Sequence, residues 1–156
     1  RTGVDLLPAT VAELSKVPNI TGIKEATGSL TRLKELQALV GADFALLSGD
    51  DASACDFLLQ GGHGVISVTT NIAPKAMALM IKAARAGNTA AAQALDKTLQ
   101  PLHRDLFIES NPIPSKWALL RLGLISSDFA RLPLTQLEPI HQSVIEQALH
   151  AANLNL

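Results

Sequence analysis

The chain has 156 residues, enough for one domain with a sizeable core. Hydrophobic residues make up 47% and charged residues 17%, so the composition excludes an intrinsically disordered protein. The formal net charge is -1 and aromatic residues account for only 3%, which argues against nucleic-acid partners and against an anionic membrane surface.

The first half of the chain alternates segments of helical and strand-like character. Apolar residues at helical spacing predict helices over residues 8–17, 29–40, 50–60 and 74–86. Short apolar runs predict strands over residues 19–26, 44–48 and 64–69. The runs do not alternate with polar residues, which is typical of parallel strands covered on both faces. Thr10 with Glu13 could form a capping box, and Ser29 is placed to cap the second helix.

The second half contains helical patterns and no strand signal. Helices are predicted over residues 89–107, 116–122 and 136–152, with a proline-rich turn over residues 108–115. Pro101 should kink the first of these helices. On the last helix the expected buried stripe consists of Leu137, Ile140, Val144 and Ala148.

The strand spacing suits right-handed βα units in a parallel sheet. Three strands do not close a barrel, which takes eight strands and about 250 residues. The chain opens with Arg1 rather than Met, and it is unusually apolar. We therefore expect a piece of a longer protein, with half a barrel favoured over a small open sheet.

Lys24 is the most informative candidate for chemistry. It lies between Ile23 and Glu25 near the carboxyl end of a strand that the pattern predicts to be buried. Burial disfavours the charged amine and lowers its pKa, and a neutral amine can attack a ketone to form a Schiff base. The structural alternative is a lysine that pairs with Glu25 or extends from a strand end into water, and spacing alone favours it.

Other candidates follow the predicted strands. Gly49 precedes two carboxylates, Asp50 and Asp51, at the edge of the sheet where barrel active sites lie. The glycine would let a ligand approach the backbone. The carboxylates are better interpreted as helix caps. Ile66 could line a pocket or simply belong to the core. Arg1 precedes the first helix and is a candidate for bidentate carboxylate binding.

No metal site or disulfide is predicted. The histidines and Cys55 lack metal-ligand spacing, so we expect no metal. One cysteine cannot form an intrachain disulfide, which suits a reducing compartment such as the cytoplasm. No apolar run reaches the roughly 18 residues that a membrane span needs.

Several motifs together resemble the dihydrodipicolinate synthase family. They are Arg-Thr-Gly at 1–3, Leu-Leu-Pro at 6–8, Gly-Ile-Lys-Glu-Ala-Thr-Gly at 22–28, Leu-Ser-Gly-Asp-Asp at 47–51, Gly-Gly-His-Gly-Val-Ile-Ser-Val at 61–68 and Asn-Pro-Ile-Pro-Ser-Lys-Trp at 111–117. The resemblance runs over essentially the whole chain and implies membership of the class I aldolase superfamily that includes N-acetylneuraminate lyase.

The resemblance implies an α/β fold. Residues 1–87 would be the C-terminal half of a (β/α)8 barrel, with strands six to eight, and residues 88–156 a helical C-terminal extension. The whole protein would be a lyase that condenses pyruvate with aspartate-4-semialdehyde, in lysine and diaminopimelate biosynthesis. It would be a cytoplasmic homotetramer, with the contact between dimers near Leu30, Thr31 and Gln60.

The resemblance also assigns roles. Lys24 would be the Schiff-base lysine, Arg1 would bind the carboxylate of the aldehyde, and Gly49 and Ile66 would contact the pyruvate adduct. The covalent Schiff base between pyruvate and Lys24 implies that no cofactor is needed. The family moves protons through two tyrosines and a threonine from the N-terminal half and a partner subunit. This chain has no tyrosine, so alone it is expected to be inactive and to need the N-terminal half of the barrel.

Two alternatives remain open at the sequence level. One is a sibling aldolase that uses pyruvate, such as N-acetylneuraminate lyase or a keto-deoxy sugar-acid aldolase; Arg1 and the Gly49–Asp51 segment argue against it. The other is a non-catalytic interaction fragment that kept the motifs, in which case pyruvate and borohydride would leave no adduct on Lys24.

Overall fold

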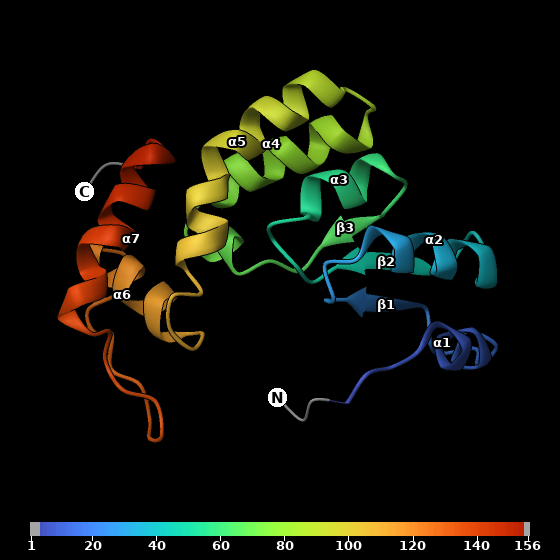
Figure 1. Cartoon of the computed structure of the whole chain (residues 1–156), viewed down its shortest axis with the longest axis horizontal. Coiled ribbons are helices and arrows are strands. Elements are labelled where there is room, and N and C mark those ends of the chain that lie inside the picture. Colours follow the sequence, from blue (N-terminus) through green and yellow to red (C-terminus); the bar gives the residue numbers. More distant parts are fainter. Residues whose placement is uncertain (1–3, 155–156) are drawn as a thin grey trace. The chain divides into compact units, whose positions relative to one another are not determined.

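A computed structural model describes residues 4–154 (Figure 1). The elements in chain order are α1 (Pro8–Leu14), β1 (Gly22–Glu25), α2 (Leu30–Leu39), β2 (Ala45–Ser48), α3 (Ala54–Leu59), β3 (Gly64–Val65), the 3-10 helix η1 (Thr69–Asn71), α4 (Pro74–Arg85), α5 (Thr89–Asp105), α6 (Ile113–Arg121) and α7 (Pro139–Ala151). The α/β class predicted from the sequence is confirmed. The chain forms two compact units that divide between Ile66 and Ser67.

The first unit is built on a parallel sheet with the strand order β1-β2-β3. In the register, Lys24 lies beside Leu47, and Leu47 lies beside Gly64. Backbone hydrogen bonds continue past the strands, since Gly49 N–H donates to Glu25 and Ile66 N–H donates to Ser48. The carboxyl ends of all three strands therefore meet at one edge.

One face of this sheet is covered by helices α1, α2 and α3. Its core consists of Val11, Leu33, Leu36, Phe44, Leu46 and Phe57, with Ile20, Ile23, Leu30 and Val40 packed around them. Successive residues of a strand point to opposite faces. Ile23 and Leu46 thus face the helices, while Lys24 and Leu47 face the other way.

The second unit is helical. Helices α4 and α5 pack against each other, and α5 packs against α7. The buried stripe of α5 includes Leu99 and Leu102, and it continues to Leu106 just after the helix. Helix α5 is continuous through Pro101. No strand lies in residues 90–154, as predicted.

The third strand is shorter than predicted. It spans Gly64–Val65 instead of residues 64–69, because β2, its one neighbour among the described strands, ends at Ser48 and offers no further ladder partner. Beyond it the backbone turns: the Thr69 carbonyl accepts hydrogen bonds from the N–H groups of Ile72 and Ala73. Residues 68 and 69 are β-branched and favour strands, but here they lie at the start of η1, because tertiary context overrides strand propensity.

Some helix starts also differ from the sequence-based predictions. Helix α1 begins with Pro8 after an apolar N-cap, so the capping box of Thr10 and Glu13 does not form. Helix α6 begins at Ile113 inside the predicted turn, because a proline is tolerated in the first turn of a helix. The Ser29 cap is confirmed: its hydroxyl accepts the Arg32 N–H at 3.3 Å.

The buried face of α7 differs from the predicted stripe. The helix begins at Pro139, and its buried residues are Ile145, Ala148 and Leu149, whereas Ile140 is 75% exposed and Val144 is half-buried. The predicted stripe stepped three and four residues from Leu137, which is buried but lies before the helix. Because helical spacing was counted from a residue outside the helix, the prediction selected Ile140, which lies on the exposed face.

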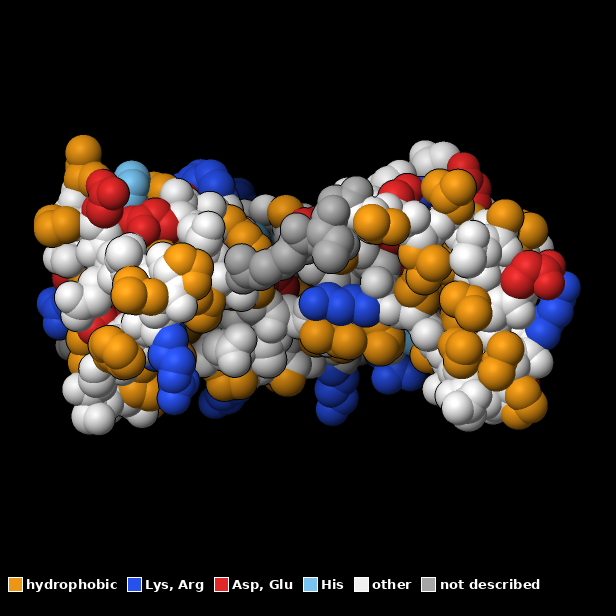
Figure 2. All heavy atoms as spheres, turned by 90° about the horizontal axis from the view of Figure 1, so that it is seen from below, with side chains coloured by type: hydrophobic (Ala, Val, Ile, Leu, Met, Phe, Trp, Pro, Cys, Tyr) orange, Lys and Arg blue, Asp and Glu red, His pale blue; other side chains and the backbone are white. Residues whose placement is uncertain are grey.

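Large apolar side chains are exposed in both units, and Figure 2 shows hydrophobic atoms at the left and the right of the face it draws. They include Val4 and Leu7 in the first unit and Leu124, Phe129 and Leu132 in the second. Within residues 4–154, no helix combines the length and the apolar character needed to cross a membrane.

Leu36→Ala should lower the free energy of unfolding by about 2–5 kcal/mol, because it leaves a cavity in a core where Leu36 is 1% exposed. The matched control is Leu39→Ala in the same helix, where the side chain is 51% exposed and the loss should stay under about 1 kcal/mol. Urea unfolding followed by circular dichroism measures both. Equal losses would contradict this assignment of the buried face of α2.

Candidate active site

The carboxyl end of β1 forms one wall of an open cavity. The cavity has a volume of about 320 Å³ and is lined by Val4, Asp5, Leu6, Ile23, Lys24, Glu25, Ala26, Thr27 and Arg32. The first three residues precede α1, the next five belong to β1 and the loop after it, and Arg32 belongs to α2. A site at the carboxyl edge of a parallel sheet is where α/β enzymes bind their ligands.

Lys24 is exposed in this chain, so the burial expected from the sequence is wrong for it. The physical reason is the alternation of β1: the described helices cover the face that holds Ile23 and Glu25, and Lys24 points to the opposite face. Among the ion pairs of residues 4–154, none involves Lys24.

Glu25 is not the partner of Lys24. Its side chain is 5% exposed, and one carboxylate oxygen accepts the N–H of Thr27 at 2.6 Å while the other lies 4.0 Å from Arg32 Nε. The pairing alternative considered for Lys24 is therefore wrong: the carboxylate next to it in sequence is used on the other face of the strand.

Gly49 lies against the side chain of Lys24. A Cβ built on Gly49 would come within 2.6 Å of Lys24 Cε, 2.9 Å of Lys24 Cγ and 2.8 Å of the Ala26 Cβ. Non-bonded carbon atoms do not approach each other this closely, so a side chain here would displace Lys24 or the backbone. The absence of a side chain at Gly49 gives Lys24 its present position.

The carboxylates after Gly49 have structural partners. Asp50 accepts hydrogen bonds from the Ser53 N–H at 2.9 Å and from the Ser53 hydroxyl at 2.6 Å, which holds the turn before α3. The helix cap predicted for the carboxylates does not form: α3 begins at Ala54 after the N-cap Ser53, which has no side-chain cap, and Asp50 holds the turn before it. Asp51 is buried.

Ile66 lies on the same side of the sheet as Lys24. Gly64 pairs with Leu47 and Leu47 with Lys24, and Ile66 is two residues beyond Gly64, which returns its side chain to that face. Ile66 is 48% exposed and does not belong to the core of the described chain. Arg1, the remaining candidate, lies outside the described residues.

A guanidinium–carboxylate pair closes one side of the cavity. Arg32 donates from its two terminal nitrogens to the two carboxylate oxygens of Asp5, at 2.5 and 2.7 Å. The hydrogen bond from Arg32 lowers the pKa of the Asp5 carboxyl and in turn raises the pKa of Arg32. Both residues were missed from sequence, because an ion pair 27 residues apart leaves no local pattern.

The histidines have structural roles, as expected, where their contacts are defined. His63 Nδ1 accepts the N–H of Leu46 at 3.0 Å, and His103 Nδ1 lies 2.8 Å from the Thr69 hydroxyl in the interior of the second unit. In the part of the chain that the structure describes, no cluster of three or more His, Cys, Asp or Glu side chains could hold a metal ion.

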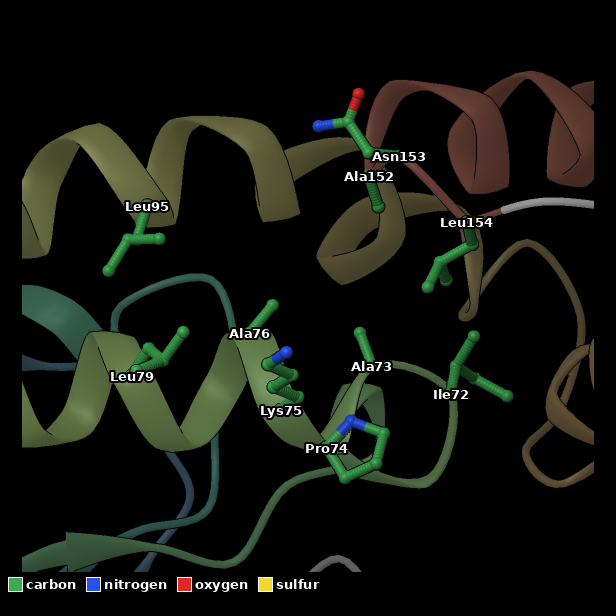
Figure 3. A pocket seen from close by; sticks show the side chains of 10 residues that line it. All are labelled: Ile72, Ala73, Pro74, Lys75, Ala76, Leu79, Leu95, Ala152, Asn153 and Leu154. Atoms are coloured by element: carbon green, nitrogen blue, oxygen red, sulfur yellow. The ribbon is translucent and has the colours of Figure 1, made fainter.

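A second cavity lies in the second unit (Figure 3). It has a volume of about 270 Å³ and is lined by Ile72, Ala73, Pro74, Lys75, Ala76, Leu79, Leu95, Ala152, Asn153 and Leu154. Its walls are mainly apolar, and it contains none of the candidate residues. It offers no nucleophile or general acid apart from the Lys75 amine, so the Lys24 cavity is the better candidate site.

Comparison with known proteins settles the family. The model of the dihydrodipicolinate synthetase family matches residues 1–152. The chain belongs to the dihydrodipicolinate synthetase family. It is 59% identical over 154 residues to the 4-hydroxy-tetrahydrodipicolinate synthase of Psychromonas ingrahamii and 56% identical to that of Methylococcus capsulatus; each alignment covers 99% of this chain and 53% of the relative.

Solved structures of the family have the same fold. The dihydrodipicolinate synthase of Acinetobacter baumannii, complexed with pyruvate, superposes with a TM-score of 0.95 at 45% identity, over 99% of this chain and 53% of that one. The Aquifex aeolicus enzyme gives a TM-score of 0.94 at 36% identity, over 100% and 53%. The chain thus spans about half the length of these dihydrodipicolinate synthases.

Gly49→Ala should lower the free energy of unfolding by about 1–3 kcal/mol, since the new methyl group overlaps Lys24 and Ala26. The matched control is Gly41→Ala, where an added Cβ meets nothing within 4 Å; it should be neutral or stabilising by up to about 1 kcal/mol. Adding Lys24→Ala to Gly49→Ala should recover part of the loss. If urea unfolding shows that the losses in free energy of unfolding of the two single variants simply add, the contact between residue 49 and Lys24 is contradicted.

Proposed function

We propose that the whole protein condenses pyruvate with aspartate-4-semialdehyde through a Schiff base on Lys24, giving 4-hydroxy-tetrahydrodipicolinate. The observation that carries this proposal is the amine of Lys24: it projects from the carboxyl end of a parallel strand, makes no ion pair among the described residues, and lies against Gly49 in a cavity. The names of the relatives and the pyruvate complex of the Acinetobacter baumannii enzyme support the substrates.

The chemistry follows from a neutral primary amine. Lys24 attacks the pyruvate ketone and water leaves, which gives an iminium ion. The iminium withdraws electrons, so a methyl proton is lost and an enamine forms. The enamine carbon attacks the aldehyde carbon, and the amine of the second substrate then displaces Lys24 as the ring closes. The step needs no metal or organic cofactor, and we propose none.

The other site roles rest on the same proposal. Arg1 would bind the carboxylate of the aldehyde, for which a planar guanidinium is well matched. Gly49 would leave room for the adduct beside Lys24, and Ile66 would contact it from the position just after β3. The position of Ile66 on the Lys24 side of the sheet supports its role.

We propose further that β1, β2 and β3 are strands six to eight of a (β/α)8 barrel, with residues 1–87 as its C-terminal half and residues 88–156 as the helical extension. The coverage of the relatives, about half, supports a missing N-terminal half. This half would cover the sheet face that holds Lys24 and Leu47, and it would supply the proton relay, since this chain contains no tyrosine.

The proposed assembly is a cytoplasmic homotetramer with the contact between dimers near Leu30, Thr31 and Gln60. Thr31 and Gln60 are exposed and Leu30 is half-buried in the first unit, which leaves this surface accessible to another subunit.

Lys24→Ala, or Lys24→Arg, should abolish the mass increment that pyruvate and borohydride leave on the full-length protein. Arginine keeps the charge but presents no neutral amine, because its pKa exceeds about 12. Lys34→Ala is the matched control, since Lys34 is an exposed lysine on α2 outside the cavity, and its adduct should equal that of the parent. An adduct retained in Lys24→Ala would refute the nucleophile and with it the proposed function.

Arg1→Ala should separate the two substrates. The pyruvate imine should still form, because Lys24 is intact, while kcat/KM for the aldehyde should fall about tenfold to hundredfold, from the loss of a charged bidentate bond worth roughly 1.5–3 kcal/mol. Assays with aspartate-4-semialdehyde and with sugar aldehydes, beside borohydride trapping, measure this. A preference for sugar aldehydes in the parent protein would favour the sibling aldolases.

A further inference from the structure

We propose that Leu47 and Gly64 are positioning residues for Lys24. Leu47 fills the place beside the lysine on the next strand, and Gly64 keeps Leu47 from crowding it. Together they direct the amine over Gly49 toward the carboxyl edge of the sheet. The inference rests on the proposed function, in which Lys24 is the nucleophile, and it assigns a task to two residues that, in our proposal, touch no substrate.

The chain segment of β2 offers three positions beside Lys24 on the face to which the lysine points, and only one of them lacks a side chain. The positions are Ala45, Leu47 and Gly49, since residues two apart on a strand point to the same face. Leu47 is the direct register partner of Lys24, across a strand spacing of about 4.8 Å. Because Ala45 and Leu47 both carry side chains, the lysine has room to lie across this strand only at Gly49.

The side chain of Lys24 follows this course. Its Cγ and Cε lie 2.9 and 2.6 Å from a Cβ built on Gly49, so the aliphatic part of the lysine occupies the space that a side chain at residue 49 would fill. Gly49 directly follows the last residue of β2 and therefore lies at the carboxyl edge of the sheet. The amine is thus directed to the edge at which α/β enzymes bind their ligands.

Leu47 packs over the strand on its other side. Because β2 lies between β1 and β3, Leu47 has Lys24 on one side and Gly64 on the other. The Cδ2 methyl carbon of Leu47 lies only 3.1 Å from a Cβ built on Gly64, which is tighter than most real contacts. Any side chain at residue 64 must displace this methyl group, and the opposite side of Leu47 is taken by Lys24. The glycine therefore keeps Leu47 clear of the lysine.

Leu47 acts by limiting the rotamers of Lys24. A lysine side chain loses much conformational freedom when one geometry is required, and neighbours that exclude other rotamers supply this order before the substrate arrives. A torsion between sp³ carbons has three staggered wells, so each torsion that Leu47 ceases to restrict should lower the reactive population by up to about threefold. The contacts join neighbouring strands of the described sheet, so they do not depend on which segment covers this face in the whole protein.

Leu47→Ala in the full-length protein should slow formation of the pyruvate imine on Lys24 by about three- to ninefold, the effect of one or two freed torsions. The rate is measured by borohydride trapping and mass spectrometry over a range of pH, and the comparison uses the limiting value reached at high pH. Gly64→Ala should also lower this limiting rate. The double variant should be no slower than Leu47→Ala alone, because the added methyl group then meets no leucine.

The matched control is Leu46→Ala, which makes the same change one residue earlier on the opposite face of β2. Leu46 is 2% exposed and belongs to the core under the helices. Its loss should lower the thermal midpoint more than Leu47→Ala does, yet leave the limiting imine rate of the folded protein within about twofold of the parent. If Leu46→Ala does not fold, Leu46→Val replaces it. Leu47→Ile, which keeps the bulk beside Lys24, should retain the parent rate.

The proposal is overturned if Leu47→Ala forms the imine at the limiting rate of the parent, or if Leu46→Ala slows it equally. It is also overturned if Leu47→Ala shifts only the pH midpoint of imine formation, because Leu47 would then act by keeping water from the amine. Should Leu47→Ala fail to fold, Gly64→Ala decides between the same outcomes. A parent protein that gives no pyruvate adduct on Lys24 would instead refute the proposed function.

Discussion

The two-sided character of β1 determines the rest of the site. In a parallel strand neighbouring residues face opposite ways, so Ile23 and Glu25 turn toward the helices while Lys24 turns away. The face of the sheet toward the helices is filled with apolar side chains. There the Glu25 carboxylate accepts the Thr27 N–H and lies near the Arg32 guanidinium. This use of Glu25 leaves the amine of Lys24 without a neighbouring carboxylate partner among the described residues.

A second constraint is the absence of a side chain at Gly49. Parallel strands lie side by side, so the first residues after β2 stand beside the first residues after β1, and the residue next to Lys24 must leave room for it. Asp50 then anchors the turn through Ser53, which keeps the backbone of Gly49 in place. The position of Lys24 thus depends on a glycine and on a hydrogen-bonded turn of the next βα unit.

Much of this could be predicted from sequence, and the failures have physical causes. The order of helices and strands and the Ser29 cap follow from local pattern and local chemistry, and so does the edge that holds Lys24 and Gly49. The exposure of Lys24 could not be predicted. A run of apolar residues predicts a strand covered on both faces, but it does not say which segments cover each face, and the described helices cover only one. The Asp5–Arg32 pair joins residues 27 positions apart and follows no spacing rule. The short third strand depends on where its neighbour ends.

The exposure of Lys24 and the half-length match to the relatives have one explanation. A face that holds Lys24, Leu47 and Ile66 carries apolar surface that favours burial, and in our proposal the preceding half of the barrel covers it. Covering this face would take the amine out of water, which favours the neutral form that attacks a ketone. The burial predicted from the run of apolar residues would then describe the whole protein rather than this chain. Activation of the nucleophile and closure of the barrel would be the same event, so neither half would hold the reactive lysine in its working state alone.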